Sequence, residues 1–354
     1  MENYRTLGKT KLNINPLGFG GIPIQRVTRE ESRDIIEEAI KLGVNFFDTA
    51  RGYTCSEEYL GDVLPKYRDK VYIATKSMSR TYQDMKNDIM ISLNNFKTSY
   101  IDLYQCHNVS KMIDFEKIMS DDGAIKALCE AKEQGLVKHI GITSHSLDFI
   151  KWLINSEYKD LFETVQIPYN FLEPEAEEVL KRCKELQIGT IAMKPLGGGV
   201  IDNSTPAIKY LLSNDNLSVL IPGMGSIEEV TKNVQAANDF HNLVSFSNEK
   251  LDKLNADEKE YINKLKAEVK GEFCHRCGYC LPCPKGIDIP SLFTLENYFD
   301  RYGLKNWALT RYKNTKVKAD ECISCQACVK KCPYQLDIPS RLKRIHNKFY
   351  NYEG

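Results

Sequence analysis

The sequence predicts an α/β protein in which a (β/α)8 barrel is followed by a small, mostly helical, cysteine-rich domain. Two observations lead to this prediction. Between Leu17 and Ala237, short apolar runs alternate with segments whose apolar residues recur every three or four positions. Beyond them, most of the 12 cysteines of the chain gather between Cys274 and Cys332. We place the domains at residues 1–245 and 246–354.

Eight short apolar runs are candidate strands, because each is bounded by turn residues. In order they read PLGFGG, NFFDTA, VYIATK, YIDLYQCH, HIGITS, TVQIPYN, GTIAMKPL and SVLIPGM. The segments between them have helical periodicity, and several begin with a Ser or Thr cap. Eight strand–helix units with short connections are typical of a closed barrel. An open doubly wound sheet is the alternative, but no Gly-x-Gly-x-x-Gly follows the first strand.

Three further segments lie outside these units. YRTLGKTKLNIN has two short alternating runs around Gly8, which predicts a hairpin that closes the bottom of the barrel. SNEKLDKLNADEKEYINKLKAEVKG is charged and has helical periodicity, so we expect a connecting helix there. IPSLFTLENYFDRYGL lies between two groups of cysteines and has the pattern of an amphipathic helix.

The composition narrows the range of partners. The chain has 354 residues, of which 42% are hydrophobic, so a large core is expected. Its 48 basic and 48 acidic side chains cancel, which argues against a nucleic-acid or membrane-surface partner. The N-terminal residues lack a signal-peptide pattern, and no apolar run approaches the length of a membrane span. We therefore expect a cytoplasmic protein, in which clustered cysteines indicate metal ligation rather than disulfides.

Polar residues lie at the carboxyl ends of the second, third and fourth predicted strands. Catalytic groups of such barrels lie at the same ends of the strands. The polar residues are Asp48 with Tyr53 beyond it, then Lys76, then His107. A buried lysine needs a counter-charge, which Asp48 can supply, and a nearby cation lowers the pKa of a tyrosine from about 10. Tyr53 could then donate a proton to a carbonyl group that His107 orients.

Each of these residues also has an ordinary explanation when taken alone. Asp48 could cap a helix, Tyr53 could be an aromatic residue at the barrel rim, and His107 could be a strand-end histidine with satisfied hydrogen bonds. Their joint occurrence at three neighbouring strand ends favours the catalytic interpretation.

The motifs as a set resemble the aldo-keto reductases. LGFGG, NFFDTARGY, YIATK, YIDLYQCHN, IGITS, QIPYN and MKPLGGG occur in the order and at the spacings of that family, over roughly residues 3–237. The resemblance implies a nicotinamide-dependent oxidoreductase whose substrate is a small aldehyde or ketone. It makes Tyr53 the general acid, Lys76 the cation that lowers the tyrosine pKa, Asp48 the partner of Lys76, and His107 the fourth member of the tetrad.

The resemblance also implies nicotinamide contacts. Thr143, Ser144 and Gln166 match positions that contact the carboxamide, although the family more often has Ser and then Asn at the first two. Met193 falls where many relatives stack an aromatic ring on the nicotinamide. The loops after the seventh and eighth strands would hold the pyrophosphate and adenosine, aided by a helix N-terminus. The residues predicted there are Pro195, Leu196, Gly197, Gly223, Ser226, Glu229 and Asn233.

Two positions depart from the family pattern. Glu229 falls where NADP-preferring relatives have an arginine that pairs with the 2′-phosphate, and Gly223 replaces a common lysine. A carboxylate would repel that phosphate. Ser226 and Glu229 also form a capping-box pattern, and capping is the alternative role of Glu229. Both NADH and NADPH therefore stay open as the cofactor.

The clustered cysteines have iron–sulfur spacing. The second group follows the C-x2-C-x2-C-x3-C-P run of two-cluster ferredoxins, in which the fourth cysteine ligates the other cluster. The first group has its cysteines three apart, one residue shorter at the last gap than that run. We expect two [4Fe–4S] clusters, one held by Cys274, Cys277, Cys280 and Cys332 and the other by Cys322, Cys325, Cys328 and Cys283. Zinc is the alternative, but structural zinc sites usually combine two separated pairs of ligands.

The combination predicts an oxidoreductase with an electron-transfer module. Clusters move single electrons and nicotinamide moves hydride, so direct exchange needs a converter such as a bound flavin. A ferredoxin or flavoprotein would be the redox partner. The alternative is a simple NAD(P)H reductase whose iron–sulfur domain is structural or docks a partner. A barrel that serves only as a scaffold is a third interpretation, which the intact set of four polar residues disfavours.

Overall fold

The computed structural model describes residues 4–245, 253–269, 274, 280–300, 303–332 and 335–352. The chain forms two compact units. The first contains residues 1–195 and 204–255, and the second contains residues 196–203 and 256–354. None of the helices in the described part of the chain combines the length and the hydropathy that a membrane crossing requires.

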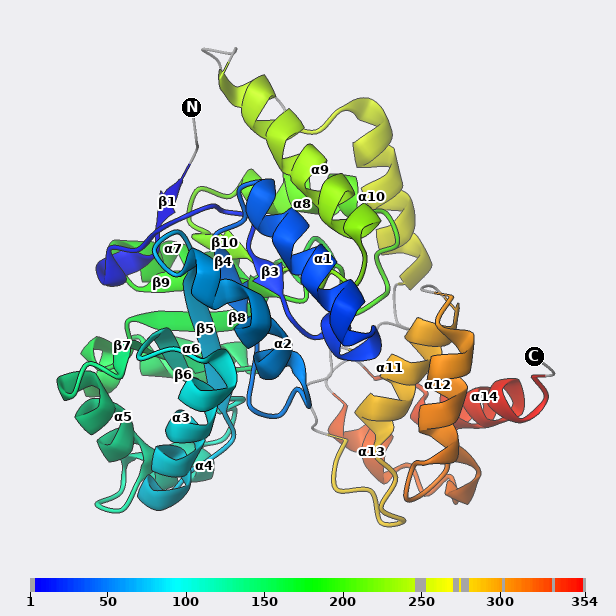
Figure 1. Cartoon of the computed structure of the whole chain (residues 1–354). Helices are drawn as coiled ribbons and strands as arrows, with labels where there is room; N and C mark the ends of the chain where they lie inside the picture. Colours follow the sequence, from blue (N-terminus) through cyan, green and yellow to red (C-terminus); the bar gives the residue numbers. More distant parts are fainter. Residues whose placement is uncertain are drawn as a thin grey trace. The chain divides into compact units, whose positions relative to one another are not determined.

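Eight parallel strands form the sheet of the first unit, in the order β10-β9-β8-β7-β6-β5-β4-β3 (Figure 1). They are β3 (Phe19–Gly20), β4 (Phe46–Asp48), β5 (Tyr72–Ser77), β6 (Ile101–Cys106), β7 (Val137–Thr143), β8 (Thr164–Pro168), β9 (Gly189–Met193) and β10 (Val219–Leu220). Parallel bridges join Leu17 to Leu220 and Gly20 to Gly223. These bridges close the sheet, so the predicted barrel is confirmed.

Helices follow the strands and cover the barrel. They are α1 (Arg29–Lys41), α2 (Ser56–Val63), α3 (Tyr82–Phe96), α4 (Met112–Met119), α5 (Ala124–Glu133), α6 (Leu147–Leu153), α7 (Glu177–Glu185), α8 (Ser204–Leu212) and α9 (Ile227–Ser245). Thr28 caps α1 in a reciprocal capping box with Glu31. Short 3-10 turns lie at Gly8–Thr10, Pro23–Arg26, Leu64–Tyr67, Glu157–Asp160, Pro174–Ala176 and, in the second unit, Ala319–Glu321.

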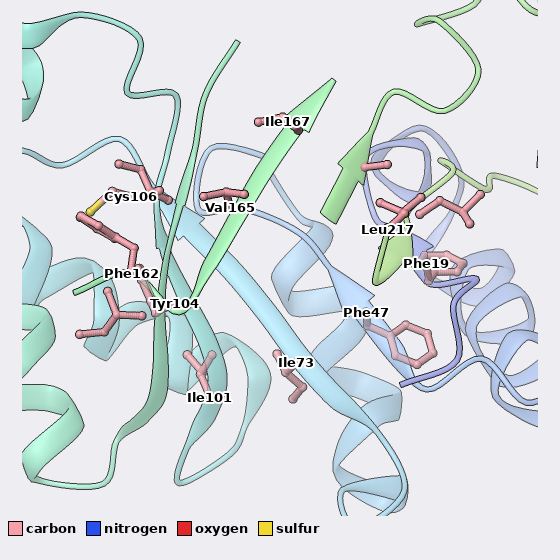
Figure 2. Packing of buried hydrophobic residues seen from close by; sticks show 14 of the residues in the cluster. Phe19, Phe47, Ile73, Ile101, Tyr104, Cys106, Phe162, Val165, Ile167 and Leu217 are labelled. Atoms are coloured by element: carbon pink, nitrogen blue, oxygen red, sulfur yellow. The ribbon is translucent and has the colours of Figure 1, made fainter. Parts of the chain in front are cut away.

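Alternation along the strands creates two buried layers. Outward side chains such as Phe47, Ile73 and Tyr104 pack under the helices, and Figure 2 shows these residues on neighbouring strands. Inward side chains such as Phe46 and Leu103 form a separate core inside the barrel. Polar side chains that continue the inward series therefore come to the carboxyl end of the barrel.

The N-terminal hairpin closes the barrel interior, as its sequence predicted. Strands β1 (Arg5–Thr6) and β2 (Asn13–Ile14) pair in antiparallel fashion. Leu7 and Ile14 are fully buried in the inner core. A Cβ atom at Gly189, at the start of β9, would lie 2.8 Å from the Leu7 side chain, so glycine is needed for this close approach.

The second unit has its own helical core. It contains α10 (Ala256–Val269), α11 (Ile289–Asp300), α12 (Lys305–Lys313), α13 (Ala327–Lys331) and α14 (Ile338–Tyr350). Leu292, Phe293 and Ile345 are among the buried side chains that join α11 to α14. Buried Glu296 accepts hydrogen bonds from Arg341 at 2.8 Å and Lys348 at 3.1 Å, which ties the same two helices together.

Candidate active site and cluster pocket

A buried ion pair lies at the carboxyl end of neighbouring strands. The Lys76 Nζ atom on β5 is 2.5 Å from Asp48 Oδ1 on β4 and donates a second hydrogen bond to the Thr49 carbonyl at 2.8 Å. Only 3% of Asp48 and 1% of Lys76 is exposed. Burial raises the pKa of Asp48 and lowers the pKa of Lys76, and in each case the opposite charge opposes that shift.

Tyr53 and His107 complete the group of four. Lys76 Nζ lies 5.4 Å from the centroid of the Tyr53 ring. The Tyr53 and His107 ring centroids are 6.0 Å apart, with an interplanar angle of 86°. The His107 backbone N–H donates to the Ser77 carbonyl at 2.9 Å, which anchors the histidine beside β5. The structure therefore brings all four predicted residues together.

His107 is held in its neutral form. Its pKa is lowered from 6.5 to about 3, mainly because burial penalises the imidazolium, and Lys76, Arg80 and Lys194 add positive charge nearby. At neutral pH the ring can donate or accept a hydrogen bond but cannot act as a cationic acid. The neutral ring keeps one N–H, which can donate a hydrogen bond to a polar group but is a poor acid.

Gln105 is part of the site, although its sequence position gave no prediction of this. It is fully buried on β6, and its Nε2 atom donates to Gln166 Oε1 at 2.9 Å and to Asp48 Oδ2 at 3.3 Å. Strand alternation was the available signal, because Leu103, Gln105 and His107 share one face of β6.

Gln105 and His107 each have one buried side-chain atom that lacks a partner within the described residues. These atoms are Gln105 Oε1 and His107 Nδ1. Unsatisfied buried groups are rare, and they indicate where a polar ligand or water is expected. The end of the barrel therefore fits a bound polar cofactor or substrate.

A second buried carboxylate supports β5 from behind, and it too was not predicted from the sequence. Glu57 on α2 is 1% exposed and accepts from Thr75 Oγ1 and Ser92 Oγ, each at 2.8 Å. It also pairs with Arg51 at 2.8 Å. Because Thr75 immediately precedes Lys76, this network fixes the strand that carries the lysine. The Glu57 charge also opposes the lowering of the Lys76 pKa by burial.

The first predicted nicotinamide contacts lie at the ends of β7 and β8. Thr143 Oγ1 accepts from the Asn108 N–H at 2.7 Å, and Ser144 Oγ accepts from the Ser146 N–H at 3.0 Å. Both residues and Gln166 are buried. Of the three, Gln166 is connected to the tetrad by hydrogen bonds with Gln105 and Asp48.

The loop after β9 is divided between the units. Met193, half-buried at the end of β9, and Pro195 belong to the first unit, whereas Leu196 and Gly197 belong to the second. Within the second unit this segment is held by Tyr261 of α10, whose hydroxyl accepts from the Asn203 N–H at 3.1 Å and donates to Asp202 at 2.6 Å.

The predicted adenosine region lies at the start of α9. Ser226 Oγ caps the helix by accepting from the Glu229 N–H at 3.1 Å, and Glu229 Oε2 accepts from the Gly225 N–H at 2.6 Å, so the Glu229 side chain has a local structural role at the start of α9. Asn233 is buried with 2% exposure. A Cβ atom at exposed Gly223 would lie 2.8 Å from Pro23 Cγ, so any side chain at this position would require Pro23 to shift.

Four cysteines of the second unit line one small pocket. They are Cys283, Cys322, Cys325 and Cys328, with Ile289 and Leu342 among the apolar residues around them. These are the four ligands predicted for one cluster, and thiolates in an apolar shell suit an iron–sulfur cluster. Cys274 is partly buried and Cys280 is buried, whereas Cys277 lies outside the described residues. In the described part of the chain, no three His, Cys, Asp or Glu side chains are arranged to hold a single metal ion.

Comparison with known proteins finds a matching family model for the barrel and another for the cysteine-rich domain. A model of the aldo/keto reductase family matches residues 16–206, and a model of a 4Fe-4S dicluster domain matches residues 273–336. The chain is 26% identical to an uncharacterized oxidoreductase, YqkF, of Bacillus subtilis over 66% of this chain and 90% of that protein. It is 25% identical to L-galactose dehydrogenase of Arabidopsis thaliana over 68% of this chain and 89% of that enzyme.

Solved structures of aldo-keto reductases resemble the barrel of this chain. The holo form of an aldo-keto reductase from Bacillus halodurans superimposes with a TM-score of 0.61 and 25% identity, over 75% of this chain and 96% of that chain.

Proposed function

The chain belongs to the aldo/keto reductase family and carries a 4Fe-4S dicluster domain, and from that premise we propose an NAD(P)H-dependent reduction of a small aldehyde or ketone, coupled to electron transfer by the clusters. The observation that carries the proposal is the buried Asp48–Lys76 pair with the Tyr53 ring beside it. An ion pair with a purely structural role would not require a tyrosine and a neutral histidine beside it.

Each of the four side chains has a separate role in the proposed reaction. Tyr53 gives its hydroxyl proton to the carbonyl oxygen as that oxygen gains negative charge, and Lys76 stabilises the resulting phenolate. Asp48 keeps Lys76 in place. Neutral His107 donates a hydrogen bond that orients the carbonyl. Bound nicotinamide would supply the hydride.

The nicotinamide would be held by Thr143, Ser144 and Gln166, with Met193 and Pro195 beside it. Leu196 and Gly197, together with Gly223, Ser226, Glu229 and Asn233, would hold its phosphates and adenosine. The Glu229 carboxylate disfavours a 2′-phosphate, and its hydrogen bond to Gly225 keeps that charge at the start of α9. We therefore expect NADH to bind at least as well as NADPH.

The clusters would have the ligands that the spacing predicts, one with Cys274, Cys277, Cys280 and Cys332 and one with Cys322, Cys325, Cys328 and Cys283. The pocket that the last four cysteines share supports the second set. A flavin at the barrel mouth would connect hydride chemistry to single-electron chemistry. A second candidate function has specific support as well, because the second unit has its own core. In that case the module is structural or docks a partner, and the barrel acts alone.

The deciding experiment uses the whole protein purified without oxygen. NADH and then NADPH are added, with and without flavin, and the broad visible absorption of the clusters is followed. Bleaching supports coupling and identifies the preferred nucleotide. Steady carbonyl reduction without bleaching supports the uncoupled reductase. Full aldehyde and ketone turnover in Tyr53→Phe would refute the catalytic assignment. Because one relative is an L-galactose dehydrogenase, aldoses belong in the substrate panel beside simple aldehydes.

A further inference from the structure

A wide groove runs along the second unit between α11 and α12. Its cavity of about 980 Å³ is lined by Leu295 and Tyr298 of α11, by Trp307 and Arg311 of α12, and by Lys316 and Val317 beyond α12. The Tyr298 and Trp307 rings meet edge to face with centroids 5.1 Å apart, and the Arg311 guanidinium lies 4.3 Å from the Trp307 ring centroid. The groove therefore combines an aromatic floor with a cationic edge.

Arg311 and Lys316 line the groove, and they belong to a basic segment of the chain. The stretch from Gly303 to Ala319 contains five basic residues and no acidic one, although the whole chain is balanced at 48 and 48. The basic residues are Lys305, Arg311, Lys313, Lys316 and Lys318, and all but the half-buried Lys318 are exposed. Within the described part of the chain, these five side chains form no ion pair with a carboxylate of this protein.

The few carboxylates around the groove have local partners. Asp288, which also lines it, caps α11 by accepting from the Ser291 hydroxyl at 2.7 Å and the Ser291 N–H at 3.3 Å. Asp320 lies 3.4 Å from His346. The charged residues that line the groove are Asp288, Arg311 and Lys316, so the lining has a net positive charge. Complementary charges on the two sides of an interface steer association strongly at low salt.

The groove begins next to a proposed cluster ligand. Gly286, which lines one end, donates its N–H to the Cys283 carbonyl at 2.8 Å, and a Cβ atom there would lie 3.7 Å from Val317. Cys325, which lines the same cysteine pocket as Cys283, is exposed, and its neighbour Ile323 is 60% exposed. The groove and the cysteine pocket are therefore connected through the turn between Cys283 and Gly286.

We propose that this groove is the docking site of an acidic one-electron carrier protein. The carrier's carboxylates pair with Arg311 and Lys316, and an apolar side chain of the carrier packs on Trp307. One electron then passes from the reduced carrier to the cluster at Cys283, Cys322, Cys325 and Cys328. The carrier is oxidised by one electron and the cluster is reduced by one, with no bond made or broken. The electron step rests on the proposed second cluster, whereas the docking step does not.

The test compares two variants of equal net charge. Arg311→Glu/Lys316→Glu reverses the two basic residues that line the groove, and Lys264→Glu/Lys266→Glu reverses two exposed lysines of α10. The probe is a strongly acidic bacterial ferredoxin. Its Kd is measured by calorimetry at low and at high salt, and the rate at which reduced ferredoxin bleaches the clusters is measured by stopped flow. Methyl viologen radical serves as a reductant that needs no docking. Iron content is determined for every preparation.

We expect the groove variant to weaken ferredoxin binding and slow cluster reduction at least 10-fold at low salt, while the α10 variant stays within about twofold of wild type. Because the viologen radical is a cation, its rate of cluster reduction should not fall in either variant. Equal losses in both variants, or no loss in the groove variant, would overturn the docking site. Wild-type protein that does not bind ferredoxin would overturn the acidic carrier. Protein that binds ferredoxin but lacks iron would refute the proposed clusters and leave the docking site standing.

Discussion

Lys76→Met tests the central ion pair most directly. The substitution leaves the Asp48 carboxylate buried without its cation, and the loss of one partner of a buried pair typically costs about 3–5 kcal/mol. Gln105 still donates to Asp48 at 3.3 Å, so we expect the lower end, about 3 kcal/mol of unfolding free energy at about pH 8. Carbonyl reduction should fall about 10²–10⁴-fold, because Tyr53 loses the charge that stabilises its phenolate.

The loss of stability should depend on pH in a defined direction. Burial already raises the pKa of Asp48, and without Lys76 nothing of opposite charge opposes that rise. The folded variant then binds a proton that the unfolded chain has released. Such a group contributes stability at low pH that disappears as pH rises through the folded pKa. The difference in unfolding free energy between variant and wild type should therefore be smaller at about pH 5 than at about pH 8.

The assay is urea unfolding under anaerobic conditions, followed by Trp152 fluorescence in a Trp307→Phe background. Trp152 lies on α6 of the barrel, whereas Trp307 lies in the second unit. Asp48→Asn/Lys76→Met is the matched control, because removal of both charges is often nearly neutral. A difference that does not change between the two pH values, or a double variant as unstable as Lys76→Met, would refute the reasoning.

Four further predictions rest on the same geometry. Tyr53→Phe should lower carbonyl reduction at least 10²-fold while the Kd for nicotinamide, measured by fluorescence titration, changes little; a large change in Kd would point to a binding role instead. The pH profile of kcat/KM should have no inflexion near 6.5 from His107, because burial and nearby cations hold its pKa at about 3; an inflexion there that His107→Gln abolishes would contradict this. Glu229→Arg should tighten NADPH relative to NADH by about 10-fold and cost about 1 kcal/mol for the lost hydrogen bond to the Gly225 N–H, as read from the two Kd values and from thermal unfolding. Cys283→Ser should lower bound iron to about half of the wild-type content, whereas Cys129→Ser on α5 should not, and equal iron in both would remove Cys283 from the ligand set.

The fold was predictable because each unit of the barrel leaves a local mark. NFFDTA and VYIATK are short apolar runs that end in a polar residue, and β4 and β5 occupy them. Asp48 and Lys76 could be placed together for the same reason, since parallel neighbours end at the same edge. The boundary of α9 was less predictable: the periodic segment suggested an end near Ala237, but the helix continues to Ser245.

The supporting shell of the site could not be predicted in the same way. Glu57 lies on the first turn of α2, where an acidic residue is expected for reasons of helix capping alone. Its role depends on Thr75 and Ser92, which are 18 and 35 residues away in sequence. No periodic pattern records such a contact, because any small hydroxyl residue would satisfy the same local preferences.

In the second unit, the cysteine pocket could be predicted from the sequence, whereas the groove could not. A cluster imposes its geometry on ligands a few residues apart, so the spacing of Cys322, Cys325 and Cys328 was enough to indicate that they share a pocket. The groove imposes no such spacing. Tyr298 and Trp307 meet only because α11 and α12 pack against each other, and each aromatic residue alone reads as part of a helix core. The basic run after Gly303 was visible in sequence, but it gained meaning only when the structure set it beside an aromatic groove that begins at Gly286.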